Sequence, residues 1–192
     1  YYSEYNSNVH RGAHSLSDKA TQAFEQARSD VAKAIGSAES RQVIWTRGTT
    51  ESINLVANTW GMENIRKGHK ILVSFLEHHS NIVPWQMLAE RTGAELLPIP
   101  VTEKGEVDLV AYESLLDEHV ALVSIAHVSN AMGTVNPIEE IISKAKAVGA
   151  KVLIDGAQGI AHYALDVEQL GCDFYAFSSS FCLSTYSHHP IQ

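Results

Sequence analysis

Short apolar runs that alternate with helical segments constrain the fold of this chain most strongly. The runs at 120–126 and 151–154 are continuous rather than alternating, which indicates strands buried on both faces. Between such runs, apolar residues recur at helical spacing, and a glycine often follows the last of them. Parallel strands joined by helices produce this pattern. The sequence therefore predicts an α/β fold, with a mainly parallel sheet covered by helices on both faces.

The expected elements extend over almost the whole chain. We expect helices at 17–35, 50–60, 81–92, 108–117 and 138–148, and strands at 43–46, 70–75, 94–99, 120–126, 151–154 and 173–178. In such sheets, ligands bind beyond the carboxyl ends of the strands. Residues 1–178 are predicted to form part of one large domain. Residues 179–192 have no charge and no periodic pattern, so we expect this tail to be disordered.

Composition excludes several classes of partner. The chain has 192 residues, 45% of them hydrophobic, and a formal net charge of -8 without a basic run, which argues against nucleic acid and anionic membranes. No apolar run approaches the roughly 20 residues of a membrane helix. Cys172 and Cys182 are too few for a disulfide framework, which fits a reducing compartment and a cytoplasmic location. Because the sequence starts at Tyr1, an organelle-targeting segment could precede it.

Asp155 ends an apolar strand and is followed by the polar turn 156–158. A carboxylate at the end of a buried strand is costly to desolvate unless a cation or a strong donor faces it. The protonated pyridine nitrogen of pyridoxal 5′-phosphate is one such partner. The alternative is that Asp155 caps the next turn, which holds for about half of lone strand-end aspartates.

Gly48, Thr49 and Thr50 precede a predicted helix. A flexible turn with two hydroxyls and unsatisfied amides at a helix N-terminus favours phosphate. Simple capping by Thr49 explains the same residues equally well. The spacing matches neither the Walker A motif nor the dinucleotide fingerprint, which lowers the probability of a nicotinamide enzyme.

His78 follows a strand directly and should lie above the strand ends. An imidazole there can stack on a planar cofactor and move protons near neutral pH. A metal site is the competing idea, but His79 points in a different direction and no third ligand is suitably spaced, so we predict none. A purely structural histidine is the more common outcome for an isolated case. His10–Gly12 and His127–Asn130 add donors suited to a carboxylate or phenolate oxygen.

Taken together, five ordered motifs are far more specific than any one of them. They are Asn8–Gly12, Arg47–Asn54, Glu77–Trp85, His127–Asn130 and Asp155–Gln158. In order and spacing the chain resembles the Suf-type cysteine desulfurases, over about residues 8–178.

The resemblance implies a class V, fold-type I enzyme that uses pyridoxal 5′-phosphate. Such enzymes convert L-cysteine, and often L-selenocysteine, and pass persulfide sulfur to an acceptor protein for iron–sulfur cluster assembly, acting as homodimers. In the family pattern Asp155 pairs with the pyridine nitrogen, Gln158 bonds the phenolic oxygen and His78 stacks on the ring and assists proton transfer. The remaining implied roles are phosphate binding by Thr49, Thr50 and Ser178, contact with the phenolic oxygen and substrate carboxylate by Asn130, and substrate contact by His10 and Arg11.

One departure from the family pattern bears on activity. Phe181 stands where the family has the lysine that binds the cofactor covalently, and no lysine follows Lys151. Phenylalanine has no amine for that linkage. The family's opening strand and its smaller C-terminal domain, which carries the nucleophilic cysteine and a substrate-binding arginine, are not represented, and Cys182 does not match that nucleophile. We therefore expect a fragment of the large domain that is inactive alone.

Two alternatives remain open. Phe181 favours a non-catalytic pseudoenzyme, or a fragment that keeps the cofactor pocket for partner binding. Another class V enzyme, an aminotransferase or a racemase, is the second alternative, and the combination of the His10–Gly12 and Glu77–Trp85 motifs argues against it.

Overall fold

The computed structural model describes residues 6–10 and 15–178. They belong to two compact units, one within Tyr1–Trp45 and Leu165–Gln169, the other within Thr46–Ala164 and Leu170–Gln192. The first unit contains helix α1 (Ser15–Ala34) and the short helix η1 (Ser40–Gln42), and α7 (Val167–Leu170) begins in it.

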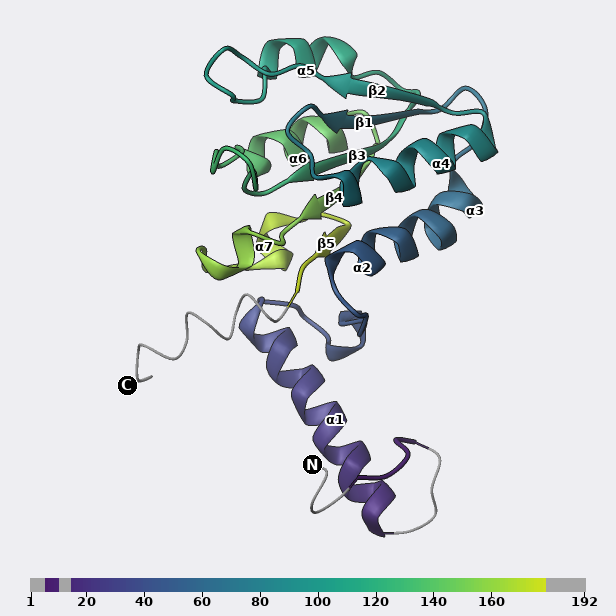
Figure 1. Cartoon of the computed structure of the whole chain (residues 1–192), viewed down its shortest axis with the longest axis vertical. Coiled ribbons are helices and arrows are strands. Elements are labelled where there is room, and N and C mark those ends of the chain that lie inside the picture. Colours follow the sequence, from purple (N-terminus) through teal and green to yellow (C-terminus); the bar gives the residue numbers. More distant parts are fainter. Residues whose placement is uncertain (1–5, 11–14, 179–192) are drawn as a thin grey trace. The chain divides into compact units, whose positions relative to one another are not determined.

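The second unit contains a five-stranded sheet in which every pair of neighbouring strands is parallel (Figure 1). Its strands are β1 (Lys70–Ser74), β2 (Glu95–Ile99), β3 (Val120–Ala126), β4 (Lys151–Asp155) and β5 (Phe174–Ala176). They lie in the order β2-β1-β3-β4-β5, so the order reverses between β1 and β3. The predicted parallel α/β fold is confirmed, and it places the carboxyl ends of all five strands at one edge.

The sheet separates two apolar cores, and successive residues of each strand contribute to opposite cores. The helical segments of this unit are α2 (Thr49–Val56), the π-helical turn η2 (Ala57–Gly61), α3 (Met62–Asn64), η3 (His79–Asn81), α4 (Val83–Thr92), α5 (Leu109–Leu115), α6 (Ile138–Ala147) and η4 (Gly159–Ala161). Val123 and Ile154 pack with residues of α5 and α6, whereas Leu122 and Leu153 pack with residues of α2 and α4. Both faces are therefore covered, as the continuous apolar runs predict.

Two boundary predictions are wrong for physical reasons. Residues 43–46 form no strand, because an extended segment becomes a strand only when a ladder partner accepts its hydrogen bonds. Gly61 does not end the helix that starts at Thr49, which continues through η2 and α3. A Cβ on Gly61 would come within 2.6 Å of Leu88 Cδ2, so this glycine permits close packing of the two helical segments.

In the described part of the chain, no helix combines the length and apolar character needed to cross a membrane. The predicted tail at 179–192 lies outside the described residues.

Candidate functional site

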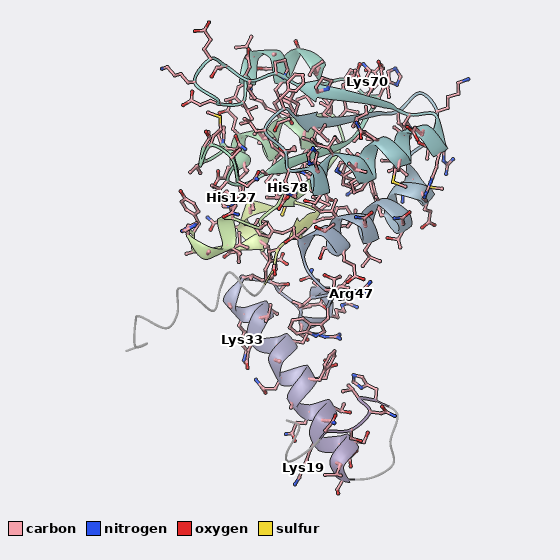
Figure 2. The ribbon with its side chains drawn as sticks, in the orientation of Figure 1. Lys19, Lys33, Arg47, Lys70, His78 and His127 are labelled. Atoms are coloured by element: carbon pink, nitrogen blue, oxygen red, sulfur yellow. The ribbon has the colours of Figure 1, made fainter. Side chains whose placement is uncertain are left out.

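A pocket of about 810 Å³ lies beyond the carboxyl ends of β1, β3, β4 and β5 and beside the N-terminus of α2. Its size is within the ~300–1,000 Å³ typical of small-molecule sites. Sequence-predicted residues that line it are Thr49, Thr50, His78, Asn130, Asp155, Gln158 and Ser178. Residues far apart in the sequence meet there because parallel strands end at the same edge of a sheet. Lys70, at the start of β1, lies well away from His78, which follows its end (Figure 2).

Asp155 is the buried acid of this pocket. Only 5% of the residue is exposed, and β3 and β5 flank the strand that ends with it. Among the described residues its carboxylate accepts one hydrogen bond, from the Ala157 N–H at 3.0 Å. Burial raises the pKa of Asp155, while the Ala157 hydrogen bond and the nearby His78 oppose that shift. A cation in the pocket would offset this desolvation cost.

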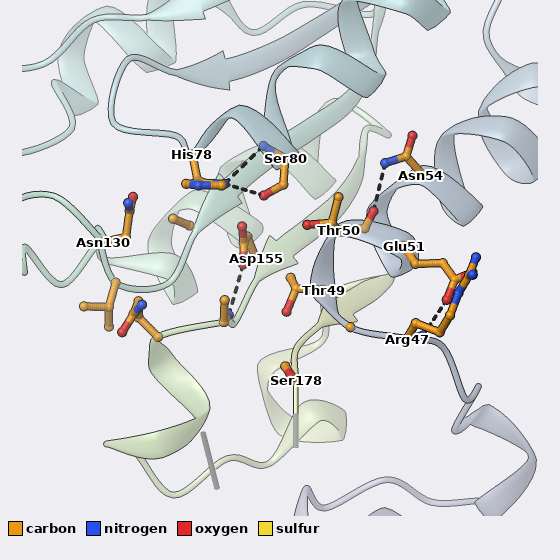
Figure 3. A pocket seen from close by; sticks show the side chains of 15 residues that line it. Arg47, Thr49, Thr50, Glu51, Asn54, His78, Ser80, Asn130, Asp155 and Ser178 are labelled. Carbon is orange, nitrogen blue, oxygen red and sulfur yellow. Dashed lines mark hydrogen bonds and ion pairs between the residues drawn. The ribbon is translucent and has the colours of Figure 1, made fainter. Parts of the chain in front are cut away.

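His78 faces the same space as Asp155 from the turn that follows β1 (Figure 3). Its Nδ1 accepts a hydrogen bond from the Ser80 N–H at 3.2 Å and lies 2.8 Å from Ser80 Oγ. An Nδ1 that accepts from an amide carries no proton, so the proton of the neutral ring is on Nε2. Ser80 thus fixes both the orientation and the tautomer of His78.

The N-terminus of α2 supplies polar groups at another side of the pocket. Gly48, its N-cap, has a φ of 138°, a conformation that side chains of L-residues rarely adopt. Thr49 follows, and its Oγ1 is buried without a hydrogen-bond partner among the described residues. The first amides of a helix also lack intrahelical partners. These groups would bind an anion well, because the positive end of the helix dipole lies there.

Arg47 also lines the pocket, but its charge is paired. Its Nη2 lies 2.8 Å from Glu51 Oε1, and its backbone N–H donates to the other carboxylate oxygen. The Glu51 hydrogen bond raises the pKa of Arg47. Because Arg47 is committed to Glu51, the hydroxyls and amides of α2 are the better anion ligands here.

Other predicted donors lie elsewhere. His127 is not among the pocket-lining residues, and its Nδ1 lies 2.9 Å from the Tyr175 hydroxyl. His10 belongs to the first unit, where its Nε2 is 3.0 Å from Glu25 Oε1. Arg11 lies outside the described residues, so substrate contact by these two residues stays a prediction.

A group of polar residues buried behind His78 was not predicted from the sequence. Glu77, Asn81 and Ser124 are all buried and joined by hydrogen bonds. A serine inside the apolar run 120–126 was the available signal. Within residues 6–10 and 15–178, no three His, Cys, Asp or Glu side chains are grouped to hold a metal ion.

Comparison with known proteins matches residues 1–181 to the family model described as aminotransferase class-V. A probable cysteine desulfurase of Vibrio cholerae is 52% identical over 178 residues, and a cysteine desulfurase of Synechococcus elongatus is 49% identical over the same number. Each match covers 93% of this chain.

The apo structure of a cysteine desulfurase from Thermococcus onnurineus matches 93% of the chain with a TM-score of 0.88 and 40% identity. The chain spans less than half of these proteins: 44% of the Vibrio relative, 28% of the Synechococcus relative and 44% of the Thermococcus chain.

Proposed function

The chain belongs to the aminotransferase class-V family, and we propose that it is part of a cysteine desulfurase whose pocket binds pyridoxal 5′-phosphate. One observation carries this proposal. A buried carboxylate, an imidazole and the polar N-terminus of a helix line a single cavity at the carboxyl edge of the sheet. The named relatives at about 50% identity supply the reaction class.

The residues of the pocket fit this cofactor group by group. Asp155 offers a buried negative charge with one hydrogen bond, which suits a protonated pyridine nitrogen. The unpartnered Thr49 hydroxyl and the first amides of α2 suit a phosphate. His78 presents a ring whose orientation Ser80 fixes, which suits stacking. No group in this set requires a metal.

Each residue then has a defined task in the proposed enzyme. When bound, pyridoxal 5′-phosphate supplies an electron sink for the carbon skeleton of the substrate. Asp155 keeps the pyridine nitrogen protonated, and Thr49, Thr50 and Ser178 hold the phosphate. Gln158 and Asn130 donate to the phenolic oxygen. His78 covers the ring and, with its proton on Nε2, can transfer that proton.

The properties of the whole protein are part of the same proposal. L-Cysteine, with L-selenocysteine as a second substrate, would be converted to L-alanine while the sulfur passes to an acceptor protein for iron–sulfur cluster assembly. We also propose that the whole protein is a homodimer, as in the resembled family. We place it in the cytoplasm, since the two cysteines of the sequence fit a reducing compartment. Residues 1–178 would form part of the large domain.

Phe181 favours a second candidate, a pseudoenzyme that binds the cofactor without turning over substrate. The covalent linkage to the cofactor needs an amine. The residue that is a lysine in the cysteine desulfurases is Phe181 in this chain, and its side chain has no amine. We propose that the chain as given is inactive for this reason.

Borohydride trapping tests this proposal. The chain mixed with pyridoxal 5′-phosphate and reduced should give no adduct at position 181, whereas the S179G/S180H/F181K variant should give one, located by peptide mass spectrometry. The same variant with D155A added is the control for pocket binding, and its adduct yield should fall sharply because the pyridine nitrogen loses its counter-charge.

Absence of an adduct in the S179G/S180H/F181K variant would contradict the proposed pocket. Formation of L-alanine from L-cysteine by the unaltered chain would contradict the proposed role of Phe181 and remove the pseudoenzyme alternative.

A further inference from the structure

A hydrogen bond between two buried side chains closes the turn that carries His78. Asn81 Nδ2 donates to Glu77 Oε2 at 2.6 Å, so the residues on both sides of the segment 78–80 are joined. Glu77 is 8% exposed and Asn81 is fully buried. Backbone bonding adds to this closure, because the Asn81 N–H donates to the His78 carbonyl at 2.8 Å.

Asn81 connects this closed turn to the helix and the strand beside it. Its Oδ1 accepts from Trp85 Nε1 of α4 at 2.9 Å and from Ser124 Oγ of β3 at 2.6 Å. Both the oxygen and the nitrogen of its amide are therefore bonded. A buried amide satisfied in this way is held in one orientation.

Glu77 connects the turn to the ends of two strands. Its Oε1 accepts from Ser74 Oγ, the last residue of β1, at 2.5 Å and from the Ala126 N–H, at the end of β3, at 3.0 Å. The β1–β3 register ends at Val73↔Ser124. Beyond that point the Glu77 side chain supplies the acceptor that β1 no longer offers to Ala126.

Ala126 is the link to the opposite wall of the pocket. It lines the pocket itself, and it pairs in register with Asp155 of β4. One carboxyl group therefore holds the segment that presents His78 and the residue that lies beside Asp155. Both of its oxygens face donors inside the protein, so Glu77 acts behind the pocket.

We propose that Glu77 is a positioning residue that fixes His78 relative to Asp155 through its bonds to Asn81 and Ala126. This inference rests on the proposed function, in which His78 stacks on one face of the cofactor ring and Asp155 faces the nitrogen of the same ring. A general contribution to stability would not require these particular partners. Burial raises the pKa of Glu77 to about 7, so the ionised carboxyl carries a desolvation cost at this place.

An exchange of the two side-chain polarities tests the proposal. In E77Q the new amide nitrogen faces the Asn81 amide nitrogen, so two donors meet. In N81D the new carboxyl group faces Glu77, and the two buried acids can remain together only by sharing a proton, so N81D serves as the second half of the exchange. In the double variant E77Q/N81D an amide again donates to a carboxylate, and Trp85 and Ser124 keep their acceptor. The three variants nearly preserve shape.

Two readouts are needed on the full chain. The first is the NMR shift of the His78 ring and of the Ala126 amide without ligand. The second is the affinity for pyridoxal 5′-phosphate, measured by titration. We expect E77Q to move the two NMR signals and to weaken binding about tenfold, the effect of losing one buried hydrogen bond, and the double variant to restore both.

Matched controls separate positioning from charge and from folding. E90Q removes a carboxylate from the exposed surface of α4 and should change neither readout. S124A removes one donor to Asn81, so it should also shift the NMR signals of the His78 ring. This variant keeps the test available if E77Q does not fold. Failure of the unaltered chain to bind the cofactor would count against the proposed function alone, because the His78 signals still test positioning. Unchanged His78 and Ala126 signals in a folded E77Q or S124A variant would overturn the inference.

Discussion

The N-terminus of α2 and the network behind His78 (Glu77, Asn81 and Ser124) both contain buried polar atoms, but they satisfy them differently. Thr49 Oγ1 has no hydrogen-bond partner among the described residues. Asn81, by contrast, has bonds at both the oxygen and the nitrogen of its amide. Unpaired buried groups cost stability and are expected where a ligand binds, whereas paired ones support the structure. Removing a polar group should therefore raise the ligand-free stability at the N-terminus of α2 and lower it in the network behind His78.

Substitution of Asp155 should have the largest effect on cofactor affinity. D155N keeps the acceptor for the Ala157 N–H but removes the charge, so affinity for pyridoxal 5′-phosphate should fall about 100-fold. The same change should raise the free energy of unfolding without ligand by about 1 kcal/mol, because burial disfavours the ionised acid. Titration and urea unfolding on one preparation measure both. Loss of ligand-free stability would place Asp155 among the supporting residues instead.

The network behind His78 should make the stability of the chain depend on pH. The pKa of Glu77 is raised from 4.5 to about 7 by burial, with nearby Asp155 adding to the rise and the Ser74, Ala126 and Asn81 hydrogen bonds opposing it. A raised pKa means that the folded chain holds the proton more tightly, so Glu77 stabilises the fold below pH 4.5 and loses that contribution as the pH rises through 7.

The free energy of unfolding of the unaltered chain relative to E77Q should therefore fall by about 3 kcal/mol across this pH range. Urea unfolding at several pH values measures the difference, and the other titrating groups largely cancel between the two proteins. A difference that is constant with pH would show that Glu77 is ionised as readily in the folded chain as in the unfolded one.

Thr49 should give the smallest of these effects. T49V replaces a buried unpaired hydroxyl with a methyl group, so the ligand-free chain should gain about 1 kcal/mol while affinity for the cofactor falls about tenfold. T92V is the matched control, because the Thr92 hydroxyl is bonded to the Leu88 carbonyl at 2.8 Å and its loss should destabilise the chain. A stability change of the same sign in T49V and T92V would contradict the distinction between unpaired and paired hydroxyls.

The sequence predicted the residues that line the pocket better than it predicted the buried network behind His78. Asp155 and His78 each follow an apolar strand, and the rule that parallel strands end at one edge was enough to bring them together. The bonds from Glu77 to Ala126 and from Ser124 to Asn81 join residues 49 and 43 positions apart, and no local pattern encodes such pairs.

The boundary errors have the same origin. Residues 43–46 have strand-like composition, but a strand also depends on a partner elsewhere in the chain. At Gly61 the local expectation of a helix end is overridden by contact with Leu88 of another helix. Local propensity identified the elements, and long-range contacts decided where some of them end.

In the proposed function, the phosphate of pyridoxal 5′-phosphate binds to the unpartnered Thr49 hydroxyl and to the first amides of α2. Calorimetric titration of the unaltered chain tests it most directly, with pyridoxal, which lacks the phosphate, as the comparison ligand. We expect saturable binding of one pyridoxal 5′-phosphate per pocket and at least tenfold weaker binding of pyridoxal, because Thr49 and the amides of α2 then have no anion to hold. Equal affinity for the two ligands, or no saturable binding of either, would show that this pocket is not a pyridoxal 5′-phosphate site of the proposed kind.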